Sequence, residues 1–291
     1  MHPHILFVAA EAAPLAKTGG LGDVVSALSI ALNNDGINTT ILMPGYGSAL
    51  DGAVKLRPCG RLTQLPGGDA SLWRGFLPDS EVEVILLRND GLYKRAGNPY
   101  VDENGCEFSD NHVRFAALSH AAALIAAGST EISIPHVVHT HDWHAGLTPL
   151  LLRERGAKAK SIFTIHNLAF QGNYPLSTAA ELGIPSGIQH SGEIEYWGQL
   201  SFMKAALSYA DRITTVSHTY AREILTPKFG HGFDGLLRAR QSDLIAVPNG
   251  IDTLVWDPEM DGLIVKNYSH DDMRGKQACK RDLQKTFGLP F

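Results

Sequence analysis

The sequence predicts an α/β protein with an open, doubly wound and mostly parallel sheet. Apolar runs as long as buried strands alternate with segments whose apolar residues recur at helical spacing, beginning with residues 4–10, 21–34 and 38–43. Polar clusters follow most of the apolar runs, and in such sheets ligands bind at the carboxyl ends of the strands. The 291 residues, 44% of them hydrophobic, suffice for one large domain or two small ones.

The first elements predict a strand–helix–strand unit. Residues 4–10 form the first strand, residues 21–34 a helix with one apolar face, and residues 38–43 the second strand. Asp35-Gly36 ends the helix and Pro44 ends the second strand. This order is the usual opening of a doubly wound sheet.

A β-rich insertion is predicted near residues 50–90. Residues 54–65, 71–77 and 82–87 are short β-like runs separated by turn residues, which favours hairpins or a meander. The loop that follows is long enough to be functional. Within it, Tyr93 and Tyr100 either stack on a sugar ring or pin the loop.

The second half of the chain repeats one theme, in which a strand ends in a polar cluster and a helix follows. The predicted helices are residues 109–127, 144–154, 197–210, 218–225 with Ser217 as N-cap, 233–240 and 271–291. The predicted strands are residues 132–140, 160–165, 212–216 and 244–247. Because parallel strands end at the same edge, five clusters should converge there: Glu11/Lys17, His141/Asp142, His166/Asn167, Ser217 and Asn249/Asp252.

Composition excludes several classes of protein. The net charge is −5, from 25 basic and 30 acidic residues without a long block of one sign, so we expect no nucleic-acid partner. Cys59, Cys106 and Cys279 form neither a disulfide framework nor a zinc motif, which favours a reducing compartment. Residues 116–128 are too short to span a bilayer, and no basic segment precedes the first apolar run. We therefore predict a cytoplasmic protein without a membrane partner.

The glycine-rich loop between the first strand and helix is the first candidate site. Glu11, Lys17, Gly19, Gly20 and Asp23 lie in it, and glycines there let the backbone approach a ligand. The spacing matches neither a P-loop nor a dinucleotide fingerprint. A site for phosphate or for a hydroxyl-rich ligand is the chemical interpretation, and a tight strand–helix turn is the structural one.

The histidine-rich segment His139–His144 allows a metal hypothesis. His-x-His at a strand end suits zinc, but Trp143 stands where a metal hydrolase would place aspartate. Core or capping histidines, and a sugar-binding loop in which Asp142 bonds hydroxyls, are the alternatives. The predicted strand 160–165 is followed by three polar residues, His166, Asn167 and Gln171. We expect their side chains to contact substrate hydroxyls.

Five motifs in order resemble those of bacterial glycogen synthases and plant starch synthases. They are Lys17-Thr18-Gly19-Gly20-Leu21, His141-Asp142-Trp143-His144, His166-Asn167-Leu168-Ala169-Phe170-Gln171-Gly172, Ser217-x-Thr219-Tyr220-Ala221-x-Glu223-Ile224 and Asn249-Gly250-Ile251-Asp252. The resemblance covers nearly the whole chain. It implies one Rossmann-like domain of a two-domain GT-B glycosyltransferase, which transfers glucose from ADP-glucose to the non-reducing end of an α-1,4-glucan with retention.

The resemblance also implies roles for single residues. His166, Asp142 and Lys17 would be catalytic, without a metal or other cofactor. Substrate contacts would come from Lys17, Gly19, Gly20, Glu11, Asp23, Tyr93, His141, Asn167, Gln171 and Asn249. Tyr93 would lie on the acceptor side, and Lys17 and its glycines would approach the phosphates of the donor.

The sequence differs from the family pattern in one respect: the second, nucleotide-binding domain is absent from it. We expect residues 1–265 to form the first domain and residues 266–291 a helical run-in to the missing one, so that the chain alone has little activity. The alternatives are a non-catalytic glucan-binding module, a related nucleotide-sugar glycosyltransferase and a metal-dependent hydrolase. Preference for ADP over UDP would lie in the missing domain.

Overall fold

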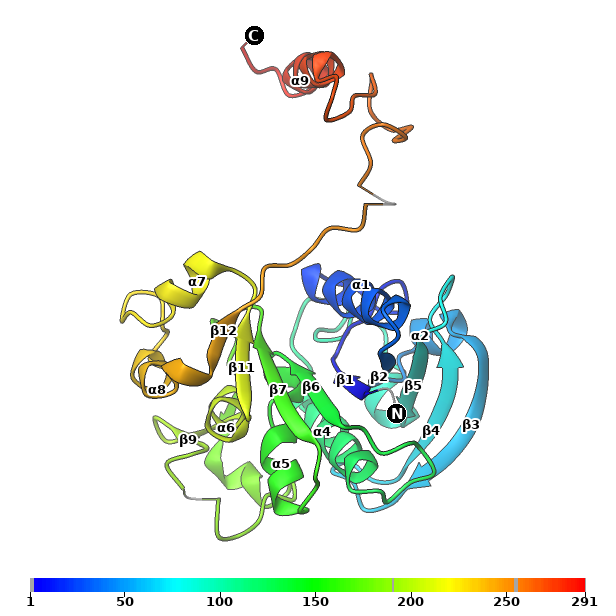
Figure 1. The fold of residues 1–291 in the computed structure, drawn as a ribbon. Helices are drawn as coiled ribbons and strands as arrows, with labels where there is room; N and C mark the ends of the chain where they lie inside the picture. The colour runs from blue at the N-terminus through cyan, green and yellow to red at the C-terminus, as the bar shows by residue number, and fades with distance from the viewer. Residues whose placement is uncertain (1–2, 190, 254–255, 291) are drawn as a thin grey trace. The chain divides into compact units, whose positions relative to one another are not determined.

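A computed structural model describes residues 3–189, 191–253 and 256–290 of the chain (Figure 1). The chain forms two compact units, one that ends at Asn249 and one that begins at Gly250. The first unit carries the sheet and every predicted site cluster except Asp252. The domain boundary expected between residues 265 and 266 lies inside the second unit. That residues 266–291 lead into a second domain stays a prediction.

The first unit is built on a mixed, mostly parallel sheet that has nine strands in the described residues. The strand order is β12-β11-β7-β6-β1-β2-β5-β4-β3. The strands are β1 (His4–Val8), β2 (Asn38–Pro44), β3 (Val54–Leu62), β4 (Ala70–Phe76), β5 (Glu83–Arg88), β6 (Val137–His141), β7 (Lys160–Ile165), β11 (Arg212–Thr215) and β12 (Leu244–Ala246). This confirms the predicted α/β class with an open, doubly wound sheet.

The predicted β-rich insertion proves to be one edge of the main sheet. Strand β5 pairs parallel with β2, and β4 and β3 then continue the sheet in antiparallel order. The three predicted β-like runs are present as strands, but they belong to the main sheet and form no layer of their own. Their apolar residues reach the common core because β5 is buried on both faces, with Val84, Ile85, Leu86 and Leu87 all unexposed.

Helices connect the strands, most of them in or near the predicted ranges, although the short helices Gly47–Gly52 and Asp90–Tyr93 were not predicted (Figure 1). In the described residues they are α1 (Gly20–Asn34), α2 (Gly47–Gly52), α3 (Asp90–Tyr93), α4 (Asn111–Ala126), α5 (Thr148–Glu154), α6 (Phe202–Tyr209), α7 (His218–Glu223), α8 (Asp234–Ala239) and α9 (Arg274–Thr286), with 3-10 turns at Trp143–Ala145, Leu176–Ala179 and Gln241–Asp243. Helix α4 packs on β1, β2 and α5, and is buried nearly all round. None of these helices is both long and apolar enough to cross a membrane.

The helix predicted for residues 197–210 is wrong in its first part. Residues Gln199–Ser201 form β10, which lies between β8 (Asn173–Pro175) and β9 (Glu195–Tyr196) in a small antiparallel sheet. The helix begins only at Phe202, because the Ser201 hydroxyl accepts a hydrogen bond from the Lys204 N–H at 3.2 Å and so caps it. Nonlocal strand pairing thus overrides the local helical pattern.

The predicted N-cap at Ser217 is confirmed, since its hydroxyl accepts hydrogen bonds from the N–H groups of Thr219 and Tyr220 at 3.2 and 3.3 Å. Replacing Ser217 by Ala leaves both donors without this acceptor, and we expect a loss of about 1 kcal/mol in the free energy of unfolding. For a domain of this size that lowers the melting temperature by about 2–4 °C. Ser217→Asn is the matched control and should melt like the parent. Equal melting of Ser217→Ala and the parent would contradict the cap.

Candidate functional site

The candidate site lies at the carboxyl ends of the adjacent strands β1, β6 and β7. The loops after these strands carry Glu11, Asp142 and His166, and direct bonds join Asp142 to His166 and His166 to His141. The predicted convergence of these three clusters is therefore found in the structure. Its physical cause is the parallel pairing, which brings the three strand ends to one edge.

Glu11 supports the glycine-rich loop from inside. Its side chain is buried, and its Oε2 accepts hydrogen bonds from the N–H groups of Thr18 at 2.6 Å and Gly19 at 3.3 Å. Oε1 accepts from the Thr18 hydroxyl at 2.6 Å and from the Tyr100 hydroxyl. Bonds within the chain occupy both oxygens, so Glu11 supports the loop, and its predicted contact with substrate stays a prediction.

Gly19 and Gly20 leave open space beside the loop. A Cβ added at either position would meet no atom within 4 Å, and neither residue has a positive φ. Gly22 differs, because its Cβ would lie 3.1 Å from the carbonyl oxygen of Ala16. Packing within the chain therefore accounts for Gly22 but not for Gly19 and Gly20. Their backbone at the start of α1 is accessible to a ligand.

Lys17 lies at the rim of this open space. Its Nζ forms an ion pair with the Asp23 carboxylate at 2.8 Å, and both side chains are about half exposed, at 51% and 54%. Asp23 lies in the first turn of α1. The pair therefore holds the lysine beside the amino end of the helix, where a cation and free N–H groups attract anions together.

Asp142 occupies the turn that follows β6, in a backbone conformation that L-residues rarely adopt, with φ 53°. Its Oδ1 accepts hydrogen bonds from the N–H of His166 at 2.8 Å and of Asn167 at 3.3 Å. Burial raises the pKa of its carboxyl to about 7, although these two hydrogen bonds oppose the shift. Asp142 thus links the β6 and β7 loops, and strain at such a turn is typical of functional sites.

The histidines of the site are neutral. Burial lowers the pKa of His166 to about 4 and those of His139 and His144 to about 3. His141 Nδ1 lies 2.9 Å from His166 Nε2, so one proton is shared between them, and burial also lowers the pKa of His141. No three His, Cys, Asp or Glu side chains gather in a metal-binding arrangement within the described residues.

The two tyrosines of the long loop have different environments. Tyr93 is 1% exposed, and its hydroxyl donates to the Arg114 carbonyl at 2.7 Å, which favours the alternative that Tyr93 pins the loop. Its place on the acceptor side stays a prediction. Tyr100 is half-buried, donates to Glu11 and stacks on His144 with ring centroids 4.6 Å apart. Tyr100 therefore belongs to the site cluster. Tyr93 was favoured on the family resemblance, and burial is not visible in a sequence.

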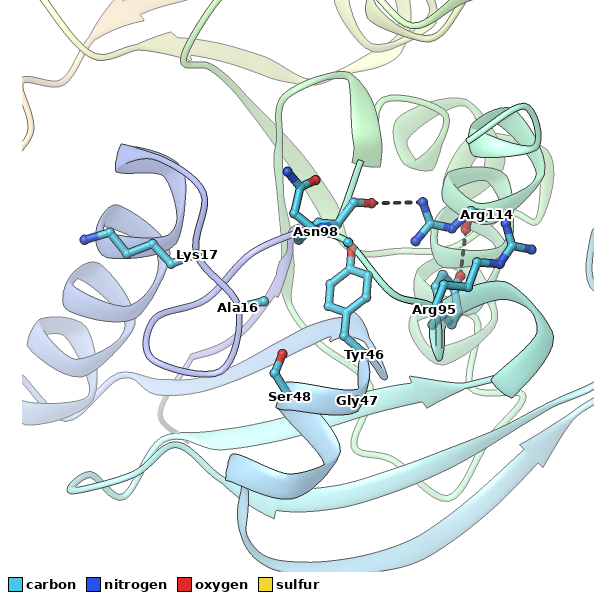
Figure 2. Close-up of a pocket in the computed structure, with 11 residues that line it drawn as sticks. Ala16, Lys17, Tyr46, Gly47, Ser48, Arg95, Asn98 and Arg114 are labelled. Carbon is cyan, nitrogen blue, oxygen red and sulfur yellow. Dashed lines mark hydrogen bonds between the residues drawn. The ribbon is translucent and has the colours of Figure 1, made fainter. Parts of the chain in front are cut away.

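A cavity of about 280 Å³ adjoins the glycine-rich loop (Figure 2). Tyr46 lies between the Ala16–Lys17 segment and the arginines in this view, while the Lys17 side chain extends away from the cavity. Arg114 is buried and donates to the carbonyl groups of Leu92 and Pro99 at 2.8 and 2.9 Å. Asp142 and His166 do not line this cavity, so it is distinct from the strand-end cluster.

The remaining predicted contacts are spread around the site. The Gln171 side chain donates to the His231 carbonyl at 3.0 Å and accepts from Asn173 at 3.0 Å, so it ties the β7 loop to the chain rather than facing a ligand. Asn167 is exposed, and its Oδ1 accepts from the Ala169 N–H at 3.0 Å. Asn249 is exposed at the end of the first unit, after β12.

Comparison of this chain with known proteins identifies its family. The family model of the starch synthase catalytic domain matches residues 4–239, which include every strand of the main sheet except β12. The chain belongs to the starch synthase catalytic-domain family. Glycogen synthase of Ralstonia nicotianae is 47% identical over 291 residues, and that of Bordetella parapertussis is 51% identical over 293 residues.

The matches to these two bacterial proteins cover 100% and 98% of this chain but only 53% and 57% of the relatives. The chain thus spans about half the length of the curated relatives it matches. A solved structure is similar as well, the catalytic domain of starch synthase IV from Arabidopsis thaliana bound to ADP and acarbose. The TM-score is 0.81 at 28% identity, with 100% of this chain and 60% of that chain covered.

The raised pKa of Asp142 predicts how the free energy of unfolding depends on pH. The folded-state pKa of about 7 exceeds the ordinary 3.8, so Asp142 favours the folded state at low pH and loses this contribution as pH rises from about 4 to 7. Asp142→Asn cannot ionise but keeps the Oδ1 acceptor. Its stability relative to the parent should rise across this range, by about 1.4 kcal/mol for each unit of pKa difference. Urea unfolding at several pH values measures this, and parallel curves would contradict it.

The role of Glu11 is tested by hydrogen exchange. Glu11→Ala removes the acceptor of the Thr18 and Gly19 N–H groups, so their exchange should become at least about tenfold faster, equal to roughly 1.4 kcal/mol of lost protection. Asp23→Asn is the control, because it breaks only the Lys17 ion pair and should leave the protection of both amides unchanged. Unchanged exchange in Glu11→Ala would show that Glu11 does not hold the loop.

Proposed function

We propose that this chain supplies one half of a retaining glucosyltransferase that moves glucose from ADP-glucose to the non-reducing end of an α-1,4-glucan. The observation that carries the proposal is the cluster of Asp142, His166 and the open backbone at Gly19–Gly20, at the edge formed by β1, β6 and β7. Family membership supports it, and so does the related starch synthase solved with ADP and acarbose.

The donor's diphosphate would lie at the amino end of α1. In glycosyl transfer the leaving diphosphate gains negative charge, and cations and backbone dipoles placed beside it lower the barrier. Lys17, paired with Asp23 at 2.8 Å, and the backbone dipoles of the first turn of α1, which begins at the exposed Gly20, offer both. The leaving group would then need no metal ion and no cofactor in this half of the site.

The transferred glucose and the acceptor would meet Asp142 and His166. With His166 Nε2 directed to His141, the Nδ1 atom of His166 is the one available for a sugar hydroxyl. Asp142 Oδ1 holds two backbone N–H groups, and Oδ2 bonds no other group in the described part of the chain. A neutral imidazole and a carboxyl oxygen at neighbouring strand ends can fix the orientation of a sugar ring.

The partners we propose are therefore ADP-glucose and a glucan, with no nucleic acid and no membrane. The three cysteines are unpaired, which supports a reducing, cytoplasmic location as part of this proposal. The choice between ADP and UDP would be made by groups outside this chain.

The proposal predicts that this chain transfers glucose efficiently only when joined to the rest of the fold. We expect little transfer from ADP-glucose to glycogen by the 291 residues alone. A fusion to the part of the Ralstonia nicotianae enzyme beyond the match should be active. In that fusion His166→Ala should lower kcat by about 100-fold, whereas His218→Ala, on the exposed start of α7, should not.

Radiolabel incorporation into glycogen measures the rates. A fusion that keeps full activity with His166→Ala would overturn the role given to His166. Transfer by the isolated chain at the rate of the fusion would contradict its being half of a site. Glycogen binding by an inactive but folded fusion would favour the glucan-binding module.

A further inference from the structure

The hairpin between β9 and β10 has an unusual residue at its tip. Tyr196 pairs with Gln199, so Trp197 and Gly198 form a two-residue turn. Both have positive φ, 51° and 80°, which is the signature of a type I′ turn. Asn-Gly is the preferred pair for such a turn, and a bulky residue in the first position is strained. Local conformation therefore disfavours tryptophan at this position.

Packing does not favour Trp197 either. Its side chain is 84% exposed, and its recorded ring contact is the edge of Tyr196 at 6.2 Å. Trp143, in contrast, is 8% exposed within the core. An exposed aromatic ring on a strained turn contributes little to the folded state of this unit. A surface function is the remaining reason to keep it there.

Contacts on both sides of the turn fix the backbone that carries Trp197. The Glu195 carboxylate accepts the Gly198 N–H at 2.5 Å across the turn, and Tyr196 stacks on Phe233 with ring centroids 4.4 Å apart. The Lys204 ammonium donates to the Glu195 carbonyl at 2.5 Å. Because the flanking residues are fixed in this way, the backbone that carries Trp197 is preorganised for binding.

The hairpin is also bonded to the loop that follows β7. The His231 carbonyl accepts hydrogen bonds from the Tyr196 hydroxyl at 2.8 Å and from the Gln171 side chain at 3.0 Å. The Ser201 hydroxyl donates to the Gln171 carbonyl at 3.2 Å. Gln171 belongs to the segment that begins with His166, so the Trp197 hairpin and the candidate site share one rigid support.

We propose that Trp197 is a stacking platform for a glucose unit of an α-glucan, outside the Asp142–His166 cluster. The inference rests on the proposed function, which makes glucan the acceptor. The C–H face of a sugar ring packs on an aromatic face, and its hydroxyls need polar neighbours. Glu195 is half-buried, and Gln199 and His231 are exposed around the turn, a polar setting that suits a sugar better than an apolar protein surface.

The turn itself provides the decisive variant. Trp197→Asn installs the residue that the turn prefers, so the chain should melt at the same temperature or about 2 °C higher. Its affinity for maltoheptaose should fall by at least about fivefold, as expected for loss of one aromatic contact. Trp197→Phe should retain most of the affinity. Trp256→Asn, at the exposed tryptophan of the second unit, should bind like the parent.

Calorimetric titration with maltoheptaose, together with glycogen co-sedimentation, measures the affinities. Equal binding by Trp197→Asn and the parent would overturn the platform and leave the proposed function intact. Failure of the parent to bind any glucan would count against the proposed acceptor, and the platform would fail with it. A lower melting temperature for Trp197→Asn would contradict the strain argument.

Discussion

Two buried carboxylates that accept backbone N–H groups hold the site in shape. Glu11 binds the N–H groups of Thr18 and Gly19, and Asp142 binds those of His166 and Asn167. In each case a strand end in a parallel sheet is linked to a loop that would otherwise lack partners for its backbone. Buried polar groups must be satisfied, so the loop conformations follow from these two side chains. The rest of the site depends on them.

The residues of the site fall into two groups, those that support the loops and those that remain accessible to a ligand. Glu11 and Gln171 are taken up by bonds within the chain, and Tyr93 is enclosed by the core. Lys17 and the backbone at Gly19–Gly20 stay accessible. A supporting layer of this kind keeps functional groups within narrow geometric limits. It also gives several of the predicted contact residues a supporting role in the fold, while their contact with substrate stays a prediction.

The protonation states of the site residues are set by burial rather than by the net charge of the chain. Burial lowers the pKa of His166 to about 4 and raises that of Asp142 to about 7, so at neutral pH the imidazole is neutral and part of the Asp142 carboxyl population is protonated. Both groups can form hydrogen bonds with the uncharged hydroxyls of a sugar. The cation at Lys17 stands apart, beside the start of α1, where we place the phosphates of the donor.

Local sequence patterns predict the class of the fold, most of the strands and helices, and the edge at which the polar clusters meet. These follow from apolar periodicity and from the rule that parallel strands end together, and both are properties of local sequence. Three features depend on long-range contacts: β3 to β5 extend the main sheet, Gln199–Ser201 is a strand, and Tyr100 bonds to Glu11 at the site. Strand pairing, burial and the direction of a side chain depend on residues far apart in the chain, and no local pattern records them.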